Sequence, residues 1–115
     1  MNLNSVTVTG LFNTFDHKVS FNKNGIAIII GENGIGKTTI LHIIDSVFNQ
    51  RLDYLFSIEF GEVLFSFTDF FWRITKKNEH TIQISNSKEK EPFCISQIRD
   101  REQDYFIRRF FSSTF

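Results

Sequence analysis

The chain has 115 residues, and its 13 lysines and arginines balance 13 aspartates and glutamates, so the formal net charge is zero. This length suits one small domain, and the balance excludes the overall basic excess of proteins that coat nucleic acid, although a local basic patch stays open. The single cysteine, Cys94, excludes an internal disulfide. Because we find neither a signal peptide nor an apolar run of membrane-spanning length, we expect a cytoplasmic protein that does not enter a membrane.

The first thirty residues predict three short strands. Residues 5–9 alternate valine with polar residues, which indicates a strand that ends at Gly10, and residues 11–15 are typical of a connecting loop. Alternation returns at residues 18–21, and the Asn24-Gly25 pair favours a type I′ hairpin. The hairpin leads into the apolar residues 26–30, the pattern of a buried strand. Because a hairpin joins antiparallel strands, we expect a mixed sheet rather than a purely parallel one.

Residues 31–38, GENGIGKT, fill every fixed position of the Walker A phosphate-binding loop, G-x-x-x-x-G-K-[ST]. Glycines at these positions let the main chain approach a ligand closely, so that loop N–H groups converge on phosphate oxygens at a helix N-terminus. The sequence therefore predicts ATP binding by Gly31, Asn33, Gly34, Ile35, Gly36, Lys37, Thr38 and Thr39.

Three of these residues have specific predicted roles. We expect the Lys37 ammonium on the β- and γ-phosphates as the catalytic side chain, the Thr38 hydroxyl as a ligand of Mg²⁺, and Thr39 near the α-phosphate. The alternative is a glycine turn that caps an ordinary helix and leaves the lysine exposed.

A helix should follow over about residues 37–48, where apolar residues recur at helical spacing. His42 lies on its polar face and is interpreted as solvated rather than as a base or metal ligand, because no second histidine sits at ligand spacing. Residues 51–60 are compatible with a short helix or with the start of a strand.

From residue 62 to residue 85 the period changes to two, which predicts a small antiparallel meander. Trp72 and its neighbouring phenylalanines sit at strand spacing, which favours core packing over a platform for stacking bases.

The C-terminal part is expected to contain a loop over residues 86–91 and then a helix from a cap at Ser96 to about residue 111. The residues expected near one face of this helix are Ile98, Tyr105, Phe106, Arg109 and Phe110. The basic residues here indicate a solvated face, with nucleic acid or a partner as the alternative.

With Asn33 before its second glycine, the loop resembles the G-x-N-G-x-G-K-[ST] of ABC-type ATPase heads, in particular the branch of SMC, RecF and OLD-type ATPases and related anti-phage ATPases of Septu and some retrons. The resemblance covers most of residues 3–85 and is specific only around the loop. It implies an α/β P-loop NTPase fold: a partial ABC-ATPase head with a mixed sheet, a P-loop helix and an antiparallel β-meander. The whole chain, residues 1–115, then forms one N-terminal ATP-binding lobe, with strands, loop and helix in 3–50, a β-subdomain in 51–85, and a loop and helix in 86–115.

The resemblance also implies partners and further site residues. Complete proteins of this kind sandwich ATP between two heads, so a homo-oligomer or head-to-head dimer is expected, with DNA or an effector protein as a further partner. Residues 13–17 would lie near the adenine or ribose, and Gln97 and Gln103 are candidates only by position for a glutamine that contacts magnesium.

Three parts of an ABC head are not found in this sequence: an apolar strand that ends in Asp-Glu, the signature motif and the switch histidine. Neither Glu59 nor Glu62 follows such a strand. We therefore expect ATP binding with negligible hydrolysis by this chain alone.

Two other function classes stay open. One is a small P-loop kinase, although such kinases usually open with the phosphate-loop strand. The other is a non-enzymatic nucleotide-sensing or assembly module. The fifteen phenylalanines fit the module, because some of them are expected to face a partner or another part of the protein.

Overall fold

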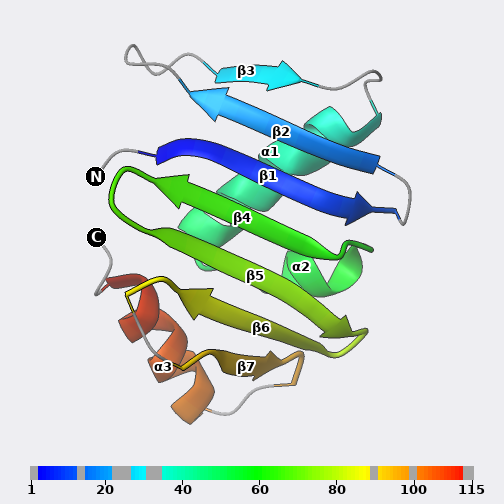
Figure 1. Ribbon diagram of the computed structural model, residues 1–115. Coiled ribbons are helices and arrows are strands. Elements are labelled where there is room, and N and C mark those ends of the chain that lie inside the picture. Colours follow the sequence, from blue (N-terminus) through cyan, green and yellow to red (C-terminus); the bar gives the residue numbers. More distant parts are fainter. Residues whose placement is uncertain are drawn as a thin grey trace.

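Seven strands and three helices make up the part of the chain that the structure, a computed structural model, describes: residues 3–12, 15–21, 27–30, 35–88, 91–98 and 101–112. In chain order these are β1 (Leu3–Leu11), β2 (Phe15–Phe21), β3 (Ala27–Ile30), α1 (Ile35–Phe48), α2 (Asp53–Ser57), β4 (Glu62–Phe67), β5 (Phe71–Asn78), β6 (Thr81–Asn86), β7 (Phe93–Ser96) and α3 (Arg101–Ser112). Figure 1 shows α1 crossing behind the sheet, α2 near β4 and β5, and α3 beside β6 and β7.

Every strand pairing among the described residues is antiparallel, in the order β3-β2-β1-β4-β5-β6-β7. The strands β1 to β3 follow one another directly, and so do β4 to β7. The crossover through α1 and α2 carries the chain from the edge strand β3 to the far side of β1, where β4 enters antiparallel. The expected mixed sheet is therefore wrong, because this crossover does not return the chain beside β3 in the same direction.

One face of the sheet carries the core. Val8 lies opposite His17 on one side and Val63 on the other, and Val63 lies opposite Ile74, which makes a continuous row of inward side chains. The alternate residues of these strands are mostly polar, as expected for an antiparallel sheet with one packed face. The buried hydrophobic residues are Val6, Val8, Leu11, Val19, Ile40, Ile43, Val47, Leu52, Leu55, Phe56, Phe60, Val63, Phe65, Phe67, Trp72, Ile74, Ile82, Ile84, Ile95 and Ile107.

Trp72 lies at the centre of this core. Its ring is fully buried and contacts Phe67 of β4 at 4.8 Å, Phe48 of α1 at 5.8 Å and Phe110 of α3 at 6.4 Å between ring centroids. One indole therefore joins the sheet to two helices, which places α1 and α3 on the same face. The core interpretation of Trp72 is confirmed, and the base-stacking platform is excluded by its burial.

The surplus of phenylalanine is mostly used inside the molecule. Among the phenylalanine side chains that the structure describes, Phe12 alone is exposed, at 37%. The others are buried or half-buried, so in the described part of the chain the expectation of partner-facing phenylalanines reduces to this one ring.

Gly10 bends β1 rather than ending it, which corrects the predicted strand end. Its φ of +68° lies in the region that favours glycine, and the register of β1 against β2 shifts between Val8 and Leu11. A Cβ at Gly10 would lie 3.2 Å from the amide nitrogen of Gly61. The glycine therefore permits a bulge where two backbones approach closely.

The bounds of α1 and α2 answer the questions that the sequence left about residues 35–60. α1 begins at Ile35, two residues earlier than predicted, and ends at Phe48 as predicted. Residues 51–60, left open by the sequence, contain the short helix α2, whose Leu55 and Phe56 are buried. The predicted meander is confirmed as β4, β5 and β6.

The C-terminal prediction needs two corrections. Ser96 belongs to β7, a strand that the sequence analysis did not predict, and α3 begins only at Arg101. Ile98 is 92% exposed outside the helix, and Tyr105 is also exposed. The inward residues are Ile107, which the prediction did not include, and Phe110, which it did: Phe110 packs against the Trp72 and Phe93 rings.

Replacing Trp72 by alanine should lower the free energy of unfolding by about 3–5 kcal/mol, because a large buried ring leaves a cavity. Phe71→Ala is the matched control, since Phe71 is half-buried on the opposite face beneath the Arg73 guanidinium. The unfolding free energies of both variants are measured in urea by far-UV circular dichroism. Tryptophan fluorescence does not serve here, because Trp72 is the only tryptophan and one variant lacks it. Equal losses in the two variants would contradict the central role of Trp72.

Candidate functional site

The phosphate-loop motif lies between a strand and a helix, as its mechanism requires. β3 ends at Ile30 and α1 begins at Ile35. Gly31, Asn33 and Gly34 fall outside the described residues, and Ile35 is described only as the first residue of the helix. The part of the predicted site whose residues can be placed is therefore its C-terminal half: Gly36, Lys37, Thr38 and Thr39.

At Gly36 the backbone of α1 lies close to the side chains of the sheet. A Cβ added there would lie 2.6 Å from Cδ2 of His17 and closer still to Nε2 of the same ring, and 3.1 Å from a methyl of Leu11. Real Cβ atoms essentially never come this near to a neighbour. Glycine at this position is therefore demanded by packing inside this chain, independently of any ligand.

The next three residues present polar groups at the helix N-terminus. Lys37 and Thr39 are half-buried and Thr38 is exposed. The first turn of α1 contains no acidic residue. The free N–H groups of a first turn and the positive end of the helix dipole favour an anion, and here no carboxylate of that turn competes for them.

The segment expected near the base or ribose is only partly described. Asn13 and Thr14 lie outside the described residues. Asp16 is exposed, and its carboxylate accepts a hydrogen bond of 2.9 Å from the Gly10 amide. His17 is 4% exposed beneath α1, so its ring serves the packing of the helix rather than an open base site.

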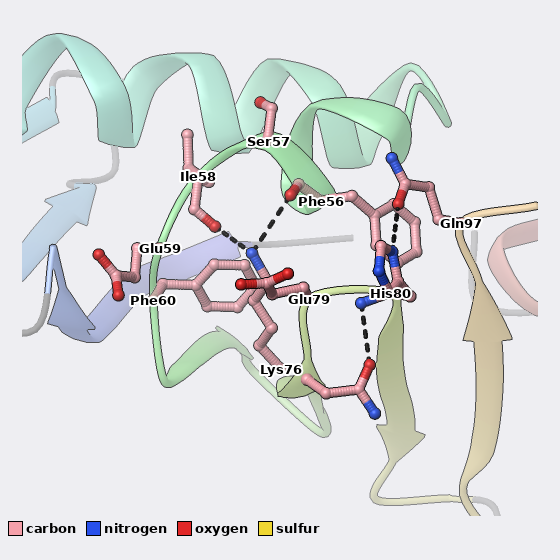
Figure 2. Close-up of a pocket in the computed structure, with 10 residues that line it drawn as sticks. Phe56, Ser57, Ile58, Glu59, Phe60, Lys76, Glu79, His80 and Gln97 are labelled. Carbon is pink, nitrogen blue, oxygen red and sulfur yellow. Dashed lines mark hydrogen bonds between the residues drawn. The ribbon is translucent and has the colours of Figure 1, made fainter.

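A pocket of about 640 Å³ lies at the end of α2, separate from the described phosphate-loop residues. Figure 2 shows the Lys76 ammonium pointing at carbonyl groups at the C-terminal end of this helix. It donates to the carbonyl oxygen of Phe56 at 3.3 Å and to that of Ile58, and lies 5.7 Å from the centre of the Phe60 ring. A cation here satisfies carbonyls that a helix leaves without an internal partner.

The α2–β4 connection, which forms part of the pocket wall, is hydrogen-bonded to β1 and to the residue that follows it. The Phe12 amide donates to the Glu59 carbonyl at 2.7 Å, and the Gly61 amide donates to the Thr9 carbonyl at 2.9 Å. Leu11, between them, touches the Gly36 position. A continuous set of contacts therefore runs from the α2–β4 connection to the first turn of α1.

The other residues singled out by the sequence do not converge on α1. His80 Nδ1 and Gln97 Oε1 are 2.8 Å apart on the pocket rim, and Gln103 Oε1 accepts from the Ser96 amide at 3.4 Å. Both glutamines follow β7, which is five strands from β2, roughly 24 Å at the usual strand spacing. Neither is placed to reach a ligand of Lys37 or Thr38, so the magnesium-contacting glutamine is not found in the described residues.

The acidic and basic candidates have structural partners or face solvent. Glu62 forms an ion pair of 2.8 Å with Arg73. His42 is exposed beside the Tyr54 ring, as predicted for a solvated residue. On α3, Arg101 and Arg108 line a shallow hollow of about 320 Å³ with Tyr105 and Asp104. No group of three potential metal ligands occurs among the described residues, and none of their helices is long and apolar enough to cross a membrane.

Sequence reasoning missed Lys76, and it named His17 only within the segment expected near the base or ribose, not as a contact of α1. The signal for His17 was available, because Phe15, His17, Val19 and Phe21 alternate, but the predicted strand began only at residue 18. Lys76 also occupies an inward position, opposite Ile82, but nothing local indicated that its partner would be the end of α2.

Lys76→Met should lower the free energy of unfolding by about 1–3 kcal/mol, because carbonyls at the end of α2 lose a charged donor. Lys77→Met, at the exposed next residue, should change it by no more than about 0.5 kcal/mol. Urea unfolding measures the stability of the two variants. If Lys76→Met were as stable as Lys77→Met, the hydrogen bonds of Lys76 to the end of α2 would not contribute to stability.

Gly36→Ala should destabilise the protein, although the same change inside a helix ordinarily stabilises by about 0.5–1 kcal/mol. The reason is the clash of the new methyl with the His17 ring. Leu41→Ala on the exposed side of α1 is the control and should be close to neutral. Thermal unfolding shows whether the stability change is a loss or a gain, and a Gly36→Ala protein more stable than wild type would refute the contact with His17.

A sequence profile of the family described as "AAA ATPase domain" matches residues 1–114, so it spans the strand–loop–helix unit, the sheet and α3. A search among curated proteins finds no match. The family indicates nucleotide binding of the ATPase type. With a profile that covers nearly the whole sequence, this chain belongs to the AAA ATPase domain family.

Proposed function

We propose that this chain binds ATP with Mg²⁺ at the N-terminus of α1. The observation that carries the proposal is that α1 begins within the glycine-rich motif, so that Gly36, Lys37 and Thr38 fall in its first turn, which contains no acidic residue. Loop N–H groups and the helix dipole then meet phosphate oxygens, and family membership supports a nucleotide as the ligand.

Each side chain of the proposed site has a role that follows from its chemistry. The Lys37 ammonium neutralises the β- and γ-phosphates, and the Thr38 hydroxyl ligates the metal ion. Thr39, half-buried one residue further, faces the α-phosphate side. Bound Mg²⁺ supplies charge neutralisation between the two terminal phosphates. An ammonium for the phosphate oxygens and a hydroxyl for the metal ion, on consecutive residues, fit a nucleotide–Mg²⁺ complex.

Hydrolysis needs a carboxylate that positions water, and no strand of the described sheet ends in an acidic pair. We therefore propose that this lobe binds ATP and that the acid is supplied elsewhere in an assembled head, by the SMC/RecF/OLD-type arrangement of two heads around the nucleotide. DNA or an effector protein would respond to that assembly, in repair or anti-phage defence. A cytoplasmic setting is consistent with the exposed free thiol of Cys94.

A non-enzymatic sensing module is the second candidate, favoured by the same lack of an acidic pair. Size-exclusion chromatography with and without ATP and Mg²⁺ tests whether the nucleotide changes the oligomeric state. A small kinase is disfavoured, because such kinases usually open with the phosphate-loop strand, whereas β1 and β2 precede β3 here.

Lys37→Ala should weaken ATP–Mg²⁺ binding by about a hundredfold or more, as expected when charge-assisted hydrogen bonds to phosphate are lost. Lys18→Ala, an exposed lysine on the outer face of β2, is the matched control and should bind like wild type. Isothermal titration calorimetry measures both. Equal affinities in the two variants would refute the proposed site.

In the same titrations, Thr38→Ala should bind ATP with wild-type affinity in the presence of a chelator but lose the increase in affinity that Mg²⁺ provides to wild type.

Wild-type protein alone should release phosphate from ATP no faster than Lys37→Ala. A clearly higher rate would contradict the need for an external acid.

A further inference from the structure

We propose that His17 is a positioning residue for the nucleotide: its imidazole is the support on which the first turn of α1 rests, and so it sets where Lys37 and Thr38 stand. This inference rests on the proposed ATP–Mg²⁺ site. It assigns a role to a residue of β2 that lies outside the phosphate-binding motif.

The contact is direct. His17 lies opposite Val8 in the β1–β2 register, with its side chain on the helix-covered face and 4% exposed. Cδ2 and Nε2 of the ring both lie within van der Waals reach of the Gly36 backbone, since a Cβ there would overlap them. Hence no side chain separates the imidazole from the main chain of α1 at this point.

The contact is also local. Further along α1, Ile40, Ile43 and Val47 are completely buried and hold the helix on the sheet. In residues 36–39, Gly36 is the buried position, whereas Thr38 is exposed. Loss of the imidazole would leave a hollow beneath the first turn alone. The turn can then shift while the rest of α1 stays seated, which separates a positioning role from a general contribution to stability.

Small displacements at such a place matter for binding. Charge-assisted hydrogen bonds to phosphate depend on distance and angle, and a misplacement of about 1 Å is enough to lose much of their benefit. The position of Gly36 fixes the neighbouring amide groups and the start of the Lys37 side chain. The support beneath Gly36 therefore acts on affinity through Lys37 and Thr38 rather than by touching the ligand.

The test compares His17→Ala with Val19→Ala, which removes a fully buried side chain at the next inward position of the same strand. Both changes should lower the unfolding temperature. Measured by calorimetry at a temperature where each variant is fully folded, ATP–Mg²⁺ should bind at least about tenfold more weakly to His17→Ala and within about twofold of wild type to Val19→Ala. Equal affinity losses in the two variants, or wild-type affinity in His17→Ala, would overturn the positioning role.

His17→Gln extends the comparison, because it keeps a polar side chain long enough to reach Gly36 and should retain affinity within about threefold. It also provides a folded variant should His17→Ala not fold. Affinity as low in the glutamine variant as in Lys37→Ala would count against support by contact alone.

A double-mutant cycle separates this inference from the proposed function. If the ring is what Gly36→Ala collides with, His17→Ala should abolish most of the stability loss caused by Gly36→Ala, whether or not nucleotide is present. Wild-type protein that binds no nucleotide overturns the proposed function, and the cycle still decides whether His17 supports α1. Additive stability losses in the cycle overturn the support itself.

Discussion

The structure depends on how closely α1 can approach the sheet. At Gly36 the helix backbone meets the buried ring of His17, and only a residue without a side chain fits between them. This approach lets Ile40, Ile43 and Val47 reach the core and fixes the beginning of the helix beside β2. The glycine of the proposed phosphate site is thus also required by the fold, so packing and the proposed ligand binding constrain the same residue.

The sheet explains why such an approach is needed. Its strands alternate in direction and bury one face, which must be covered by helices that arrive from different parts of the chain. α1 covers this face at β1 and β2, and α3 covers the same face near β7 through Ile107 and Phe110. The Trp72 ring touches both helices and several phenylalanines of the sheet. The aromatic surplus that suggested a partner surface therefore serves mainly to fill a broad, thin core.

The functional groups lie at one region of this architecture. The first turn of α1 stands beside β2 at His17, and the α2–β4 connection reaches the same neighbourhood through Phe12 and Leu11. Lys76, which holds the end of α2, therefore connects the meander to the site indirectly. The residues that follow β7 lie on the opposite edge of the sheet. Within the described residues no strand ends in an acid pair, and the groups proposed for phosphate and metal lie at the N-terminus of α1, which agrees with the proposed binding lobe of an ATPase.

The sequence by itself determined what depends on near neighbours along the chain: the phosphate-loop motif, the helix that follows it and the β4–β6 meander, because period and turn residues are local signals. It did not determine which strand β4 would join, the antiparallel direction of every described pair, or the existence of β7. It also did not show that His17 supports Gly36 or that Lys76 holds α2. These features were decided by the tertiary structure alone, because each depends on contacts between segments far apart in the sequence, where packing and register select partners that no local pattern specifies.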